Sequence, residues 1–202
     1  MSRSQDPLLQ ALTALHGALR DVGEPHMLIG GMAVVLRGVA RLTEDVDATV
    51  WGQTIDVDSL LATLARHGIV GRIPDVASFA RERQVVLLRH EPTGTPMEVS
   101  LAWLPFEREA LRRAEVIEVA GMGIPVARAQ DLVVYKAIAW RDRDRADIER
   151  LLRGHGSEID LAEVRRIVAE FAEALGEKER LGEFDRLVAR VTKASRQPPR
   201  TR

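Results

Sequence analysis

The sequence changes its hydrophobic pattern near residue 127, and this change constrains the fold more than any other feature. Before it, short apolar or alternating runs bounded by glycine and proline predict strands interspersed with helices. From Arg128 onward, apolar residues recur only with helical spacing. Strands gathered early and helices gathered late are typical of an α+β sheet domain followed by a helical subdomain. We therefore expect a sheet domain over residues 1–127 and a helical subdomain over 128–194.

Periodicity and turn signals also predict the individual elements. The expected strands are residues 26–29, 45–51, 84–90, 97–104, 116–120 and 124–126. The expected helices are residues 8–22, 32–37, 59–67, 106–113, 130–153, 161–175 and 178–191. The end of the chain, 195–202, is rich in proline and arginine, and we expect it to be disordered.

Composition and missing motifs exclude several classes of protein. The longest apolar run, residues 27–36, is about half the roughly 20 residues that a membrane-spanning helix needs, so we expect no membrane partner. The chain contains no cysteine, which excludes disulfides and thiolate metal sites and fits a cytoplasmic location. Its five histidines show no ligand spacing, and neither P-loop nor dinucleotide-binding glycine patterns occur. The net charge of -1 gives no general argument for nucleic acid.

The most informative motif is a pair of aspartates at strand spacing. Side chains at i and i+2 of a strand share a face, so Asp45 and Asp47 present two carboxylates together while Val46 and Ala48 face the core. Two such charges about 5 Å apart repel by roughly 3 kcal/mol at an effective dielectric near 20. A Mg²⁺ ion removes this penalty, and it typically takes one or two carboxylates together with substrate phosphates. The alternative is a solvated pair on an edge strand.

A double glycine and a third acid strengthen the metal interpretation. Gly30-Gly31 joins an expected strand to an expected helix, where backbone amides can approach a phosphate, although many such pairs are only turns. Glu98 interrupts an otherwise apolar strand and is the best candidate for a third carboxylate. Its alternative is an outward position on the face of Ser100, while Glu91 and Asp75 are weaker candidates because they lie in turn-like sequence.

These motifs resemble a known family. Gly-Gly, a spacer and Asp-hydrophobic-Asp, preceded here by Arg-Leu-Thr-Glu at 41–44, is similar to the core motif of the DNA polymerase beta-like nucleotidyltransferase superfamily. More narrowly, the chain resembles the AbiEii-type minimal nucleotidyltransferases of bacterial toxin-antitoxin and abortive-infection systems. That group also carries a helix with one lysine, followed by Arg-x-Lys/Arg-Asp-x-x-Asp opening the next helix, which matches the run 130–148. The resemblance covers about residues 25–155.

The resemblance implies a nucleotidyltransferase fold, a mixed sheet flanked by helices, and a Mg²⁺-dependent reaction. An acceptor hydroxyl would attack the α-phosphate of an NTP and release pyrophosphate. By this likeness, Asp45 and Asp47 would ligate two Mg²⁺ ions, and Glu98 would complete the ion that activates the acceptor. The acceptor would be tRNA, another protein or a small molecule such as an aminoglycoside, and a cognate antitoxin would be a partner.

The resemblance also assigns residues to the nucleotide. Gly30 and Gly31 would hold the triphosphate. Arg41 and Thr43 complete the predicted nucleotide-binding set: Arg41 is close in sequence to this turn and would favour a nucleotide electrostatically, although the alternative is an ordinary surface arginine. Lys136 would reach the triphosphate or the reacting centre.

Asp144 would orient Lys136 or an acceptor group. An alternative for Lys136 is a stem extended along the surface with its ammonium in water. The charges of 141–147 can instead form exposed pairs at helical spacing, and Asp147 is expected to be structural.

Two departures from the family pattern support a rival function. Gly31 stands where many members of the superfamily have serine, and the third acid is Glu98 rather than aspartate. The rival is a nucleotide-binding module with weak or no catalysis that acts as a regulatory or antitoxin-like partner. Separately, the stretch 186–202 contains six basic residues and no acidic one, so it could contact a phosphate backbone.

Overall fold

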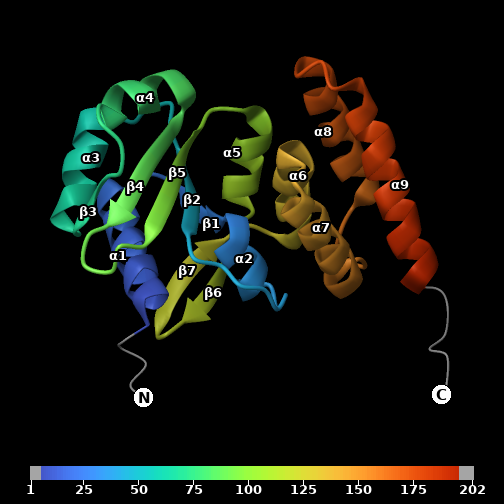
Figure 1. Ribbon diagram of the computed structural model, residues 1–202, viewed down its shortest axis with the longest axis horizontal. Helices are drawn as coiled ribbons and strands as arrows, with labels where there is room; N and C mark the ends of the chain where they lie inside the picture. The colour runs from blue at the N-terminus through green and yellow to red at the C-terminus, as the bar shows by residue number, and fades with distance from the viewer. Residues whose placement is uncertain (1–5, 196–202) are drawn as a thin grey trace. The chain divides into compact units, whose positions relative to one another are not determined.

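The structure, a computed structural model, describes residues 6–195 and contains two compact units. The sheet unit comprises the residues up to 36 and 41–127, and the helical unit comprises 37–40 and the residues from 128 onward. The sheet unit contains seven strands in the order β3-β4-β5-β2-β1-β7-β6 (Figure 1). These strands are β1 (His26–Ile29), β2 (Val46–Trp51), β3 (Ile69–Gly71), β4 (Val85–His90), β5 (Pro96–Ala102), β6 (Glu115–Val119) and β7 (Met122–Val126).

The sheet is mixed, as the α+β prediction requires. Strand β2 runs parallel to β5 and antiparallel to β1, and β1 runs parallel to β7. The helices of this unit are α1 (Pro7–Val22), α2 (Gly30–Leu36), α3 (Val57–Arg66), α4 (Val76–Arg83) and α5 (Pro105–Arg112). The predicted fold class is confirmed: a mixed sheet with helices is followed by a helical region.

Helix α1 shows why the sequence folds as predicted at its beginning. Asp6 caps the helix by accepting a hydrogen bond from the Leu8 amide at 2.9 Å, and Pro7 occupies the first turn, where its missing N–H costs nothing. The apolar residues in the middle of the helical stripe, Leu12, Leu15 and Leu19, are at most 1% exposed. Gly23 ends the helix in the left-handed conformation.

Two elements of the sheet unit are absent from the sequence prediction, and both are short. Strand β3 has only three residues, yet it pairs with β4 along its whole length. Helix α4 buries a single residue, Ala80, so it has no apolar stripe to reveal it. Asp75, one of the weaker candidates for the third acid, begins this helix and caps it at the Ser78 amide.

The helical unit contains α6 (Ala129–Ala139), α7 (Asp142–His155), α8 (Leu161–Ala174) and α9 (Lys178–Ser195). Periodicity predicts one helical segment over 130–153, whereas the resemblance implies that a second helix opens at the Arg-x-Arg-Asp motif. The structure has two helices, separated at Trp140, which adopts the left-handed conformation with φ 53°. Helix α9 runs four residues beyond the predicted end at 191. Of the tail expected over 195–202, all but Ser195 lie outside the described residues.

No helix within residues 6–195 combines the length and the apolar character needed to cross a bilayer.

Candidate functional site

The aspartate pair lies at the beginning of β2, near the centre of the sheet. Asp45 directly precedes the strand and Asp47 is its second residue, and both are half-buried. Val46 and Ala48 are fully buried on the opposite face, as the strand alternation predicts. The strand thus exposes two carboxylates to one side while its other side is fixed in the core.

Gly30 forms a corner that only glycine can form. It stands between β1 and α2 with φ +66°, a conformation that other residues rarely adopt. Its neighbour Ile29 pairs with Asp47 across the antiparallel strands, so the Asp47 side chain lies against the Gly30 Cα. A Cβ at position 30 would lie 2.6 Å from the Asp47 Cβ and closer still to its carboxylate. The corner and the carboxylate therefore exclude any side chain between them.

Gly31 is crowded by side chains and not by its backbone conformation. A Cβ at this position would lie 2.6 Å from the Thr43 Oγ1 and 3.1 Å from the Arg41 Cζ. A serine at position 31 would therefore require Thr43 to move. The Thr43 hydroxyl donates a hydrogen bond to the Asp45 Oδ1 at 2.9 Å. Four residues of the predicted nucleotide-binding set, Gly30, Gly31, Arg41 and Thr43, thus lie together with the aspartates. The fifth, Lys136, belongs to the helical unit.

Glu98 lies on the same face as Asp47, one strand away. The two residues are directly opposite each other in the parallel pair β2–β5, and Ser100 lies on this face too, opposite Thr49. From the sequence, Glu98 could lie either on the face of Ser100 or beside the aspartates. In the sheet these two positions are on the same face. The Glu98 carboxylate is bound there by the guanidinium of Arg72, an ion pair that the sequence analysis missed. Only a prediction of β3, which Arg72 follows directly, could have revealed it.

The donor set suits Mg²⁺ without forming a complete metal centre. Among residues 6–195, no three His, Asp or Glu residues are grouped closely enough to hold a metal ion on their own. Mg²⁺ does not require this, because it prefers oxygen ligands and is commonly bound by one or two carboxylates together with substrate phosphates. Asp45 and Asp47 fit that requirement, whereas Glu98 fits it only when Arg72 releases it.

Lys136 and Asp144 meet in the interior of the helical unit. The Lys136 Nζ lies 3.0 Å from the Asp144 Oδ1 and 3.1 Å from the Asp147 Oδ2. Lys136 is only 5% exposed, and the two aspartates are 0% and 1% exposed. The alternative of a solvated Lys136 is therefore wrong, because two buried carboxylates hold its ammonium below the surface.

Asp144 is ionised in this cluster despite its burial. Burial opposes the charge, but hydrogen bonds from Arg141 and Lys136 outweigh it and hold the pKa of Asp144 below its usual value. The Asp144 Oδ2 accepts from the Arg141 amide at 3.0 Å and from the Arg141 Nε at 2.7 Å. The expected surface pairs at helical spacing exist for Arg145 and Asp142, whereas Asp144 and Asp147 point inward.

One family model identifies the family of this chain. The model of the family described as "Nucleotidyltransferase of unknown function (DUF6036)" matches residues 8–196, which is nearly the whole chain. This chain is a member of that nucleotidyltransferase family. No curated protein matches it.

Two solved structures share the fold of this family member. One is the solution structure of the antibiotic-resistance factor ANT(2'')-Ia, with 17% identity, a TM-score of 0.55, and coverage of 91% of this chain and 100% of that chain. The other is the crystal structure of ANT(2'')-Ia in complex with adenylyl-2''-tobramycin, also with 17% identity and a TM-score of 0.55, covering 84% of this chain and 99% of that chain. At this identity the likeness establishes the fold alone.

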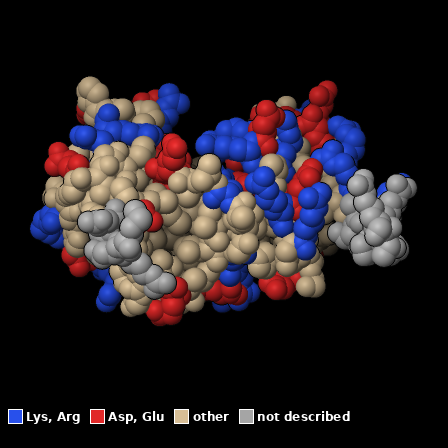
Figure 2. All heavy atoms as spheres, turned by 60° about the horizontal axis from the view of Figure 1, so that its bottom comes forward, with Lys and Arg blue, Asp and Glu red and all other residues tan. Residues whose placement is uncertain are grey.

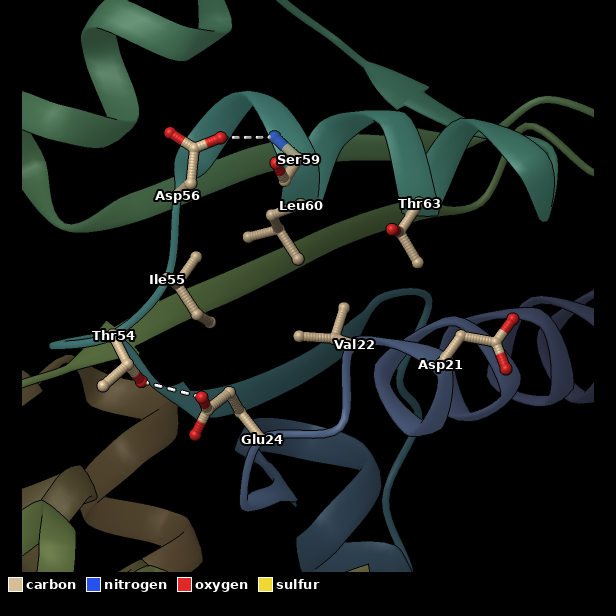
Figure 3. A pocket seen from close by; sticks show the side chains of 9 residues that line it. All are labelled: Asp21, Val22, Glu24, Thr54, Ile55, Asp56, Ser59, Leu60 and Thr63. Carbon is tan, nitrogen blue, oxygen red and sulfur yellow. Dashed lines mark hydrogen bonds between the residues drawn. The ribbon is translucent and has the colours of Figure 1, made fainter.

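The nucleotidyltransferase chain also has an acidic hollow of about 270 Å³ between the end of α1 and the beginning of α3 (Figure 3). Each of its three carboxylates has a protein partner. Asp56 caps α3, Glu24 accepts a hydrogen bond from Thr54 at 2.8 Å, and Asp21 lies 2.8 Å from the His67 Nε2. The capping bond with Ser59 lowers the pKa of Asp56. This hollow is thus explained by local structure and needs no ligand.

Proposed function

We propose that this protein transfers a nucleoside monophosphate from an NTP to the hydroxyl of an acceptor. One observation carries the proposal: the Asp47 carboxylate lies directly against the glycine corner at Gly30. Carboxylates beside a corner with approachable backbone amides suit a metal-bound triphosphate. Family membership and the shared fold support the same reaction class. The crystal structure of ANT(2'')-Ia holds adenylyl-2''-tobramycin, and an adenylyl group on an acceptor is the kind of product we expect here.

Different residues of the sheet unit would bind the metal ions and the triphosphate. Asp45 and Asp47 would hold Mg²⁺, with Glu98 completing a second ion, while Gly30 and Gly31 would hold the triphosphate. When bound, Mg²⁺ offsets the charge that develops on the attacking and leaving oxygens. The acceptor hydroxyl loses its proton to solvent as its oxygen forms a bond to the α-phosphorus, the bond from this phosphorus to the bridging oxygen breaks, and pyrophosphate leaves. Most of the acceleration would come from positioning and electrostatics.

Two side chains, Thr43 and Arg41, would support these groups. Thr43 donates to Asp45 and thereby leaves its other oxygen for a cation. Arg41 lies against Gly31, where a guanidinium suits a phosphate. In the helical unit, Asp144 and Asp147 hold the Lys136 ammonium below the surface, so the predicted role of Lys136 at the triphosphate is not part of this proposal.

For the acceptor we favour RNA, as in a toxin of the AbiEii type that acts in the cytoplasm with a cognate antitoxin. Arg186, Arg190 and Lys193 recur at helical spacing on the exposed face of α9, a pattern that suits a phosphate backbone, although Arg190 also pairs with Glu149. Basic side chains lie beside acidic ones over the helical unit (Figure 2), so this contribution is local. An aminoglycoside is the second candidate acceptor, favoured by the complex of ANT(2'')-Ia.

The test is a transfer assay with each labelled NTP and Mg²⁺, in which RNA, protein and aminoglycoside acceptors are supplied separately. Asp47→Ala should lower transfer by about 1000-fold or more, because a lost metal ligand costs several kcal/mol of transition-state stabilisation. Asp58→Ala is the matched control, since Asp58 is an exposed acid of the same unit, paired with Arg81. Equal transfer by the wild type and Asp47→Ala would contradict the proposal.

The ion pair of Glu98 with Arg72 favours the rival function, a nucleotide-binding module with weak catalysis. Calorimetric titration with each NTP, with and without Mg²⁺, separates the two. Tight NTP binding without transfer to any of the acceptors would support the rival.

A further inference from the structure

Arg72 stands at the end of a row of residues that crosses the sheet to the aspartate pair. Its amide donates to the Leu87 carbonyl at 3.0 Å, which continues the pairing of β3 with β4. Leu87 is directly opposite Glu98, and Glu98 is directly opposite Asp47. Residues opposite each other in a sheet share a face. The backbone thus fixes Arg72 on the face of the two carboxylates, with only Leu87 between it and Glu98.

The charges in this row favour the arrangement. Asp47 and Glu98 are neighbours on adjacent strands, where like charges opposite each other destabilise a sheet. The Arg72 guanidinium binds Glu98 Oε1 and so neutralises one of the two. The pair is only partly exposed, with 32% of the Arg72 side chain and 46% of the Glu98 side chain accessible. A divalent cation would supply the same neutralisation to both carboxylates.

We infer that Arg72 is a positioning residue that sets how strongly this site holds divalent cations. Its guanidinium and the cation compete for the Glu98 carboxylate, so the third acid joins the site only when the cation displaces Arg72. The inference rests on the proposed function, because it takes the carboxylates to be ligands. Glu98 stands in place of the aspartate that is commoner in the family, and its longer side chain reaches Arg72 across Leu87.

A merely structural ion pair would behave differently. Arg81 and Asp58 form such a pair in the same unit, at 2.5 Å, and the Arg81 side chain is 50% exposed. Asp58 lies on α3 and does not belong to the sheet. Loss of Arg81 should therefore leave cation binding unchanged, whereas loss of Arg72 should change it.

The experiment titrates the full chain with Mn²⁺, a spectroscopic substitute for Mg²⁺, with and without a non-hydrolysable NTP analogue. The proteins are the wild type, Arg72→Gln, Arg72→Lys, Glu98→Gln, Arg72→Gln/Glu98→Gln and the control Arg81→Gln. Arg72→Gln should bind Mn²⁺ about two- to five-fold more tightly, the range expected when a partly exposed ion pair no longer competes. Arg72→Lys should restore most of the wild-type affinity, and the double variant should match Glu98→Gln.

Thermal unfolding of each variant shows that it is folded. Unchanged or weaker Mn²⁺ binding by Arg72→Gln would overturn the inference, as would a tighter binding that persists when Glu98 is already Gln. If the wild type binds no Mn²⁺ even with the NTP analogue, the proposed function itself fails. If the wild type binds and Arg72→Gln binds equally well, only this inference fails.

Discussion

The two charged clusters of this protein balance their charges in opposite ways. In the helical unit, Lys136 is enclosed by Asp144 and Asp147, and all three are almost fully buried. In the sheet unit, Asp45 and Asp47 remain half-buried beside a glycine corner. The first cluster holds its cation within the chain, so it should stabilise the fold. The second presents carboxylates at a surface, so it should bind a cation from outside. The two clusters should therefore respond differently to mutation.

The largest effect on stability should come from Lys136→Met. It leaves two buried carboxylates without their cation, and breaking a buried ion pair from one side costs about 3–5 kcal/mol. Urea unfolding would measure this loss in the free energy of unfolding. Lys178→Met is the control, because Lys178 is exposed on α9 and surface changes stay within about 0.5 kcal/mol.

The same measurement on Asp47→Asn completes the comparison. Asp47→Asn removes one of two neighbouring carboxylates and relieves their repulsion, so it should cost much less stability than Lys136→Met. A large loss of stability in Asp47→Asn, or a negligible one in Lys136→Met, would show that the clusters do not differ in this way.

A smaller effect is expected at the glycine corner. Gly30→Ala forces a Cβ into a left-handed position and against Asp47, and residues held in sparsely populated backbone conformations cost about 1–3 kcal/mol. Gly94→Ala separates the two causes, because Gly94 has φ +73° with no atom within 4 Å of the added Cβ. We expect Gly30→Ala to be the less stable variant and to lose NTP affinity in a calorimetric titration. Equal stability of the two variants, with unchanged NTP affinity of Gly30→Ala, would show that the glycine corner is not part of the nucleotide site.

The aspartate pair and the division into a sheet and a helical part were predictable from the sequence, because the residues concerned are local in the chain. The alternation of 45–48 predicts which side chains of β2 face the core, and the helical period after Arg128 predicts a helical subdomain. Long-range pairing was not predictable. The Arg72–Glu98 ion pair depends on β3, whose three residues are too few to show a period.

The burial of Lys136 was equally hidden. Its partners lie eight and eleven positions later, beyond the break at Trp140, so no single helix face reveals them. The left-handed Trp140 is held by contacts from α9: the Arg180 guanidinium lies 5.5 Å from its ring centre, and Glu183 accepts from its indole nitrogen at 2.6 Å. Such contacts are tertiary, and they override the helical propensity of the segment.

Acid should weaken the helical cluster through Asp144. Because the pKa of Asp144 is lowered in the folded state, its contribution to stability is present above the pKa of the unfolded chain, about 4, and is lost as the pH falls through the lower folded value. Urea unfolding at several pH values from 6 downward measures this slope. Asp144→Asn should reduce the slope below pH 4, and Asp58→Asn should not. An unchanged slope in Asp144→Asn would place the acid sensitivity elsewhere.

The smallest effect should come from Thr43→Val, which keeps the shape of the side chain but removes the hydroxyl that donates to Asp45. A hydrogen bond of this kind contributes about 1 kcal/mol, so transfer should fall by roughly five-fold with little change in stability. Thr54→Val is the matched control, since it also removes a hydroxyl bonded to an acid, Glu24, but lies outside the aspartate pair. If both variants lower transfer equally, Thr43 has no specific role. If only Thr43→Val does so, the orientation of Asp45 matters, as expected for a carboxylate that holds a ligand from outside the chain.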